Sequence, residues 1–239
     1  NEIELEYDFN YLMVSQFGPR KNFENALKWW VEEFIDQEVG LVVKTNFVAN
    51  SIIDWDYTYN ALKNTLSKYS DRKCKVYILH GDCSPEQMAG LYANPKIKAL
   101  VNIAHGEGFG LPMFEAARAA LPIVCVGWSG HMDFLHVNDK DYFVNVDYKL
   151  DPVQQEAIWE GVIEKEMLWA YADQGSYKMG LRRVKRDIKK YEAMALELQN
   201  HINENFNEEK LYAGFCKAIY DPSEEEQEWM KELSNIEIL

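Results

Sequence analysis

Short apolar runs alternate along the chain with longer segments in which apolar residues recur every three or four positions. The first pattern is typical of buried strands and the second of amphipathic helices. Six strands are predicted, at Asn10–Ser15, Gly40–Lys44, Lys75–Leu79, Ile97–Ile103, Pro122–Val126 and Tyr142–Val146. Helices are predicted between them, at Asn22–Asp36, Ile52–Tyr69, Pro85–Ala93 and Leu111–Ala120. Strict alternation of this kind predicts an α/β fold with one doubly wound, Rossmann-like parallel sheet of six strands.

The stretch between the fourth and fifth predicted strands carries the most specific pattern. From Gly106 to Val124 it reads GEGFGLPMFEAARAALPIV, with three glycines at the start of a helix. In open parallel sheets ligands bind at the carboxyl ends of the strands, where glycines let the backbone approach a ligand and helix N–H groups face it. This turn is therefore predicted to hold an anion.

Two carboxylates accompany the turn, Glu107 within it and Glu115 on the following helix. Pro112 falls in the first helical turn, where its missing N–H is tolerated, so that Glu115 lies one turn further along and can face the same crevice. Carboxylates accept hydrogen bonds from pairs of hydroxyl groups, which ribose and hexose rings offer.

The glutamates, the glycines, the proline and the following buried strand together resemble the donor-binding signature of retaining family-4 glycosyltransferases of the GT-B fold. The glycine turn also fits two other interpretations. A dinucleotide-binding fingerprint has different glycine spacing and follows the first strand of its sheet. A glycine turn without any ligand is the second alternative.

The resemblance implies a role for each matching residue. Glu107 would contact the donor sugar near the reacting centre, and Glu115 would hold the ribose hydroxyls. The backbone N–H groups at the start of the helix, and those of the glycine turn before it, would face the leaving phosphate. These further donor-binding positions are Gly108, Phe109, Gly110 and Leu111.

The turn after the first strand, QFGPRKN, supplies the positive charge that such a crevice needs. Lys21 and Arg20 open the first helix and can reach phosphate oxygens. In the resembling family this turn carries an arginine and a lysine. Lys21 matches the lysine, whereas Gln16 stands at the arginine position, so that either Arg20 substitutes or phosphate binding is weakened.

Two further turns are expected to border the crevice. After the third strand, Ser84 and Gln87 form a capping-box pattern. The resemblance implies that this loop holds the nucleotide base, with Cys83 as a contact, although a capped helix without a ligand is an equal alternative. After the fifth strand, the glycine turn that ends at His131 is expected to line the sugar pocket.

The expected chemistry is sugar transfer from a UDP- or GDP-linked donor, with no further cofactor. Negative charge grows on the leaving diphosphate, and Lys21, Arg20 and the helix N–H groups would stabilise it without a metal. The resemblance implies retention of the anomeric configuration. A DxD sequence does occur, at Asp54 to Asp56, but it is interpreted as charge at a helix start, with metal binding as a minor alternative.

Composition narrows the range of partners. Lys and Arg total 25 against 39 Asp and Glu, a net charge of −14, which disfavours a general nucleic-acid surface. The four cysteines form no CxxC pair, which favours reduced thiols and a cytoplasmic location. No apolar run is long enough to predict a transmembrane segment. The expected partners are a nucleotide-sugar and an unknown acceptor.

Residues 1–150 are predicted to form the donor-binding domain, with residues 151–239 as a helical extension that packs on it. The chain is expected to be helical throughout from Pro152 to Tyr220, with one long helix that carries an apolar stripe from Leu181 to Ile202. The acceptor-binding domain that normally precedes a donor domain in this family is not recognised in the sequence. A partner chain or a missing domain is therefore expected to complete it.

Three hypotheses follow from the sequence. The first is the donor half of a retaining glycosyltransferase, whose activity on its own is doubtful. The second is a nucleotide-sugar-binding or regulatory subunit without turnover. The third is a scaffold whose helical and acidic C-terminal region binds a protein partner.

Overall fold

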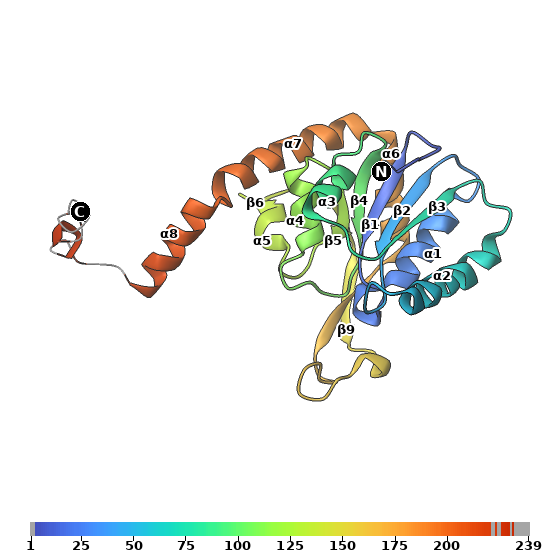
Figure 1. The fold of residues 1–239 in the computed structure, drawn as a ribbon, viewed down its shortest axis with the longest axis horizontal. Coiled ribbons are helices and arrows are strands. Elements are labelled where there is room, and N and C mark those ends of the chain that lie inside the picture. Colours follow the sequence, from blue (N-terminus) through green and yellow to red (C-terminus); the bar gives the residue numbers. More distant parts are fainter. Residues whose placement is uncertain (1–2, 221–222, 224–225, 230, 232–239) are drawn as a thin grey trace. The chain divides into compact units, whose positions relative to one another are not determined.

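The computed structural model describes residues 3–220, 223, 226–229 and 231 of the 239. Its core is a six-stranded sheet in the order β3-β2-β1-β4-β5-β8, in which every paired strand is parallel (Figure 1). The strands are β1 (Asn10–Val14), β2 (Gly40–Thr45), β3 (Lys75–His80), β4 (Ile97–Asn102), β5 (Ile123–Val126) and β8 (Val144–Val146). The predicted fold class is confirmed.

Helices cover both faces of this sheet. The four helices between the first five strands are α1 (Phe23–Phe34), α2 (Ile52–Leu66), α3 (Pro85–Tyr92) and α4 (Leu111–Arg118). Right-handed crossovers place α1 and α2 on one face and α3 and α4 on the other (Figure 1). The chain reverses direction across the sheet between β1 and β4, and ligands of open α/β sheets bind at such a point.

The core explains why these segments fold as they do. Strands β1 and β2 are buried on both faces, which accounts for their continuous apolar sequences. Helix α1 buries Phe23, Trp30 and Phe34 among others, at helical spacing. Burial of each such side chain stabilises the fold by about 1.5–3 kcal/mol.

The region after β8 differs from the sequence prediction, which was wrong for residues 152–172. Strands β9 (Tyr148–Pro152) and β10 (Leu168–Ala172) form an antiparallel pair, with a short 3-10 helix, η3 (Gln155–Ala157), in the connection. In Figure 1 this hairpin extends beyond the edge of the main sheet. Strand β9 is largely exposed and therefore lacks the alternation of apolar and polar residues by which a half-buried strand is recognised.

The single long helix expected around residues 181–202 is two helices. Helix α6 (Gln174–Arg186) has Asp187 as its C-cap, and α7 (Ile188–Asn205) begins at the next residue. The Asp187 carboxylate accepts hydrogen bonds from Arg186, 2.7 Å from Nη2, which favours a local turn over a continued helix. Short elements that the prediction omitted are α5 (Met132–Leu135), β6 (His136–Val137) and β7 (Lys140–Asp141).

The chain divides into two compact units, Asn1–Asn200 and His201–Leu239. The first contains the sheet, its covering helices and the hairpin. The second contains α8 (Glu208–Ile219), which has no buried residue. The boundary between the units lies fifty residues beyond the one expected from the sequence, because α6 packs against α1, β5 and β8 as part of the first unit.

Candidate functional site

The candidate site is built where the turns after β1 and β4 meet. These strands are neighbours in the sheet, with Leu12 opposite Leu100, so their carboxyl ends lie side by side. A 3-10 turn, η1 (Pro19–Lys21), follows β1. The His105 N–H donates to the Arg20 carbonyl at 2.9 Å, and the Asn22 amide donates to the Ile103 carbonyl at 3.1 Å. The two turns therefore form one hydrogen-bonded surface.

Glu107 is the centre of this surface, and its side chain is only 7% exposed. Lys21 Nζ lies 2.6 Å from both carboxylate oxygens, and Arg20 Nη1 lies 3.5 Å from Oε2. The Asn102 amide donates to Oε1 at 3.2 Å. The structure thus brings Glu107, Lys21 and Arg20 together, and the three side chains carry a formal net charge of +1.

Asn102 is a site residue that the sequence interpretation missed. It is the last residue of β4, and it is buried although it is polar. Its carbonyl oxygen accepts a hydrogen bond from the Ala104 N–H at 2.9 Å while its amide group binds Glu107. A polar residue at the carboxyl end of an otherwise apolar strand was the available signal.

A third turn, after β5, fixes the backbone of Glu107. The Ser129 hydroxyl accepts from the Glu107 N–H at 3.1 Å and lies 2.6 Å from the Glu107 carbonyl, to which it donates. The Gly130 N–H donates to the same carbonyl at 3.2 Å. A Cβ atom on Gly130 would lie 1.6 Å from the Gly108 carbonyl oxygen, so only glycine permits this approach.

Helix α4 begins beside the Glu107 cluster. Gly110 is its N-cap with φ of +87°, a conformation that favours glycine. Among the described residues, no hydrogen bond engages the N–H groups of Phe109, Gly110 or Leu111. Phe109 and Leu111 are exposed. Free N–H groups at a helix N-terminus, next to a cluster of net positive charge, are suited to an anion such as a phosphate.

The remaining predicted donor contacts lie apart from Glu107. Glu115 is exposed on α4 near Tyr92 at the end of α3, and the pKa of Tyr92 is raised by burial and then by the Glu115 charge. Cys83 is half-buried just before α3, which begins with the predicted capping box of Ser84 and Gln87. These residues are on the α3/α4 side of the sheet.

Gln16 and His131 make contacts with the backbone of neighbouring turns. The exposed Gln16 donates from Nε2 to the Phe47 carbonyl at 2.6 Å. His131 is buried, and its Nε2 donates to the Val126 carbonyl at 2.7 Å. Burial lowers the pKa of His131, against the opposing effects of the Val126 carbonyl and the Glu107 charge. Among the described residues no hydrogen bond joins either side chain to the Glu107 carboxylate, although the Glu107 charge acts on the His131 ring.

The DxD sequence lies in the first turn of α2, as expected. The Asp54 carboxylate is buried and accepts hydrogen bonds from the N–H groups of Phe47, Val48 and Ala49 at 2.6–2.9 Å. It also binds His80 Nε2 at 2.7 Å. Burial acts to raise the pKa of Asp54, but the bonds from His80 and the backbone outweigh it and hold the pKa well below its usual value. Asp54 therefore fixes the loop after β2.

The hairpin of β9 and β10 creates two clefts around the site. One has a volume of about 400 Å³ and is lined by Glu107, Arg20 and Ser129 together with Trp128 and the hairpin residues Met167, Leu168 and Trp169. The other, of about 520 Å³, lies on the α1 side of η1. The sequence did not predict the hairpin, and so it did not predict the wall that the hairpin contributes to each cleft.

Further features of the described residues bear on the site. No group of three His, Cys, Asp or Glu side chains is arranged as metal ligands within the described ranges. The four cysteines are unpaired. No helix in the described part of the chain is both long and apolar enough to cross a membrane.

Comparison with known proteins identifies the fold. The C-terminal domain of the glycosyl transferase group 1 family protein LpcC from Francisella tularensis superposes with a TM-score of 0.56 at 13% identity, over 84% of this chain and 87% of that one. The chain has the fold of a glycosyltransferase C-terminal domain. Sucrose-phosphate synthase from Thermosynechococcus elongatus gives 0.61 at 17% identity, over 88% of this chain and 45% of that one.

Two further comparisons bear on this domain. HepE from Anabaena, solved in complex with UDP and glucose, has a TM-score of 0.60 at 13% identity, over 88% of this chain and 48% of that one. Serotype-specific mannosyltransferase WbdA from Escherichia coli is 30% identical over 118 residues, which are 48% of this chain. The match spans 13% of that protein's length. No protein-family model matches the chain.

Proposed function

We propose that this chain is the nucleotide-sugar-binding half of a glycosyltransferase. The observation that carries the proposal is the cluster of Glu107, Lys21 and Arg20 beside the free N–H groups of α4, at the point where ligands of such sheets bind. The similarity to a mannosyltransferase, to a glycosyl transferase domain of the same fold and to HepE, which was solved with UDP and glucose, supports it. The proposed donor is a hexose linked to UDP or GDP.

The chemistry of transfer fits this arrangement. When the bond between the anomeric carbon and the diphosphate breaks, negative charge grows on the leaving phosphate. Arg20, which is 43% exposed, and the N–H groups at the start of α4 would stabilise that charge, since preformed donors need no reorganisation during the reaction. Lys21 would share its charge between the phosphate and Glu107. We propose that transfer proceeds with retention of configuration and without a metal.

Glu107 has two roles in this proposal. Glu107 lines the cleft with Trp128 and Trp169, and its carboxylate would there accept hydrogen bonds from the hydroxyl groups of the donor sugar. Its ion pair also holds Lys21 at the turn where the phosphate would bind. On the α3/α4 side, exposed Glu115 would bind the ribose hydroxyls, and the loop at Cys83 would contact the base.

Thermal unfolding of the chain with UDP, GDP, ADP and their hexose conjugates tests the proposal. A ligand that binds only the folded state raises the melting temperature. We expect one nucleoside diphosphate to raise the melting temperature. Glu115→Ala should weaken the binding of that nucleotide by ~1 kcal/mol or more, because hydrogen bonds to the ribose are lost. Absence of a shift with every nucleotide would contradict the assignment. Glu204→Ala, at an exposed position of α7, is the matched control.

A further inference from the structure

The larger cleft, of about 520 Å³, is separate from the proposed donor contacts. Its walls come from the turn after β1, the first turn of α1, the loop after β2 and the β9–β10 hairpin. Glu115 and Cys83, by contrast, lie on the other face of the sheet. The volume is within the range of small-molecule sites in proteins.

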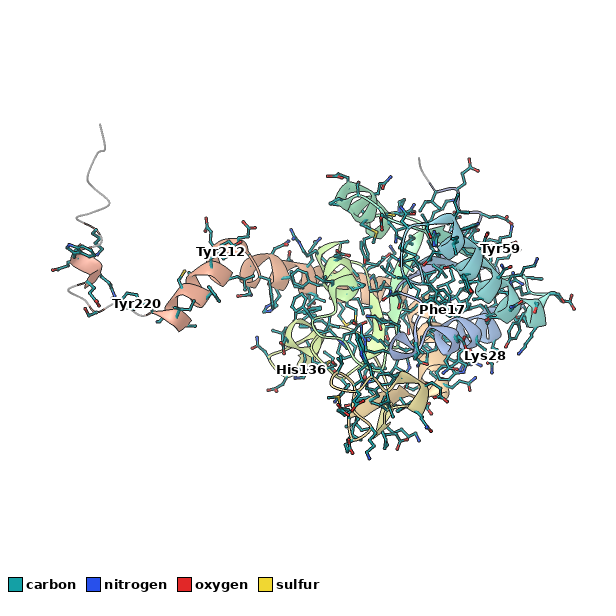
Figure 2. The ribbon with its side chains drawn as sticks, turned by 60° about the horizontal axis from the view of Figure 1, so that its bottom comes forward. Phe17, Lys28, Tyr59, His136, Tyr212 and Tyr220 are labelled. Atoms are coloured by element: carbon teal, nitrogen blue, oxygen red, sulfur yellow. The ribbon has the colours of Figure 1, made fainter. Side chains whose placement is uncertain are left out.

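One wall of this cleft is aromatic. Phe17, which is labelled in Figure 2, belongs to this wall. Its ring stacks on that of Phe47 with centroids 4.5 Å apart, and its centroid lies 4.5 Å from that of Phe23. All three side chains line the cleft. A rigid aromatic wall buries the apolar face of a flat ligand, such as the C–H face of a sugar ring, with little loss of side-chain entropy.

Other lining residues of this cleft are polar and carry negative charge. Glu24 on α1 and Glu156 on η3 are exposed, and no hydrogen bond or ion pair within the described residues engages either carboxylate. The amides of Asn25 and Gln154 lie in the same lining, which contains no lysine or arginine. Free carboxylates and amides bind hydroxyl groups, whereas the two negative charges disfavour an anionic ligand.

His105 adds an unsatisfied acceptor to the lining. It is 1% exposed, and its Nδ1 donates to the Ala170 carbonyl at 2.8 Å. Burial lowers the pKa of the ring, which leaves Nε2 as a neutral acceptor, and this buried atom has no hydrogen-bond partner among the described residues. Buried polar atoms of this kind are rare unless a ligand or water completes them.

The same histidine connects the cleft with the Glu107 site. The His105 ring stacks on Trp169, with centroids 5.2 Å apart and planes inclined by 12°. Trp169 in turn lines the cleft around Glu107, so the stacked pair forms the wall between the two spaces. A ligand in the larger cleft would therefore lie next to the proposed site of sugar transfer.

We propose that the larger cleft binds a neutral saccharide, the acceptor of the transfer. That the saccharide is the acceptor rests on the proposed function. That the ligand is a neutral saccharide rests on the residues of the cleft alone. The donor half of the enzyme thus contributes to acceptor recognition through its hairpin. Phosphorylated or uronic-acid saccharides are disfavoured because Glu24 and Glu156 line the cleft and no lysine or arginine does.

Saturation-transfer difference NMR on the full chain tests the inference, with mannotriose as the neutral probe and mannose 6-phosphate as the anionic one. We expect saturation transfer from the protein to mannotriose and none to mannose 6-phosphate. Glu24→Gln combined with Glu156→Gln should lower the affinity for mannotriose by about fivefold or more, since two charged hydrogen-bond acceptors become neutral ones. Glu160→Gln, exposed on the same hairpin but outside the cleft, should change nothing.

Three outcomes would overturn the inference: no transfer to mannotriose, transfer that the double variant leaves unchanged, or displacement of mannotriose by a nucleoside diphosphate. The last would show that the cleft belongs to the donor. Melting temperatures with nucleotide, measured on the same samples, separate the two proposals. A nucleotide-induced rise without saccharide binding leaves the donor proposal standing and removes this one.

Discussion

Individual side chains in this protein have two kinds of partner, and the sequence predicted one kind better than the other. Ser84 and Gln87 bind each other across three residues, and their pairing was visible as a local motif. Lys21 and Glu107 were both recognised as site residues, but they are 86 residues apart in sequence. Their direct contact depends on β1 and β4 being neighbours in the sheet. Asn102 was missed because its role appears only when that contact exists.

The Lys21–Glu107 pair should show strong energetic coupling. Lys21→Met leaves a buried carboxylate with weaker compensation, and we expect it to lower the free energy of unfolding by ~2 kcal/mol. Glu107→Gln together with Lys21→Met should recover part of that loss, giving a coupling energy of ~1–3 kcal/mol in a double-mutant cycle measured by urea unfolding. Additive effects would show that the ion pair is absent in solution.

Asp54 should make stability depend on acid pH. Its pKa is lower in the folded chain than in the unfolded one, where it is ~4, so its contribution is complete above that value and is lost as the pH falls through it toward the folded pKa. Asp54→Asn should therefore destabilise the protein most near neutral pH, and the difference from wild type should shrink below pH ~4. Urea unfolding of both proteins at a series of pH values from neutral to below ~4 measures this difference in the free energy of unfolding. The exposed neighbour Asp56→Asn should show no such trend.

At the scale of secondary-structure elements, prediction succeeded where burial decides the pattern. Strands β1, β2, β4 and β5 are largely buried and mostly apolar, and each was recognised. The β9–β10 hairpin was not, because β9 exposes most of its side chains and pairs only with β10. The break at Asp187 was also missed, since the apolar stripe continues through it. Exposed elements and helix ends depend on local contacts that apolar periodicity does not encode.

The close approach of two turns at Gly130 and Gly108 should be essential for stability. Gly130→Ala places a methyl group against the Gly108 carbonyl, and we expect it to cost about 1–3 kcal/mol through forced backbone movement. Gly108→Ala is the matched control, because a Cβ atom there meets nothing within 4 Å. Equal effects of the two substitutions on the urea midpoint would contradict the packing of these turns.

The whole molecule consists of one compact α/β unit and a short helical one. The sequence correctly predicted the class of fold and its helical C-terminal region. It placed the end of the first unit at residue 150 because the helices after the sheet were expected to be an extension. Helix α6 instead buries Tyr177, Leu181 and Val184 in the core that includes β5 and β8.

The first unit should be stable without α8. Helix α8 has no buried residue, and a segment that buries little apolar surface contributes little to stability. A chain that ends at Asn205 should therefore unfold within ~0.5 kcal/mol of the full chain in urea. A larger loss would mean that α8 stabilises the sheet unit.

The central place of β1 in the sheet has a consequence for how the protein folds. Strand β1 pairs with β2 on one side, but its other partner, β4, begins only at Ile97. Closing such a distant contact is slow, because a long stretch of chain must be ordered before the pairing compensates for its entropy. During synthesis the first strands emerge with one edge of β1 unpaired, and the ion pair of Lys21 with Glu107 forms only after β4 docks. The candidate site therefore cannot be assembled before β4 has paired with β1.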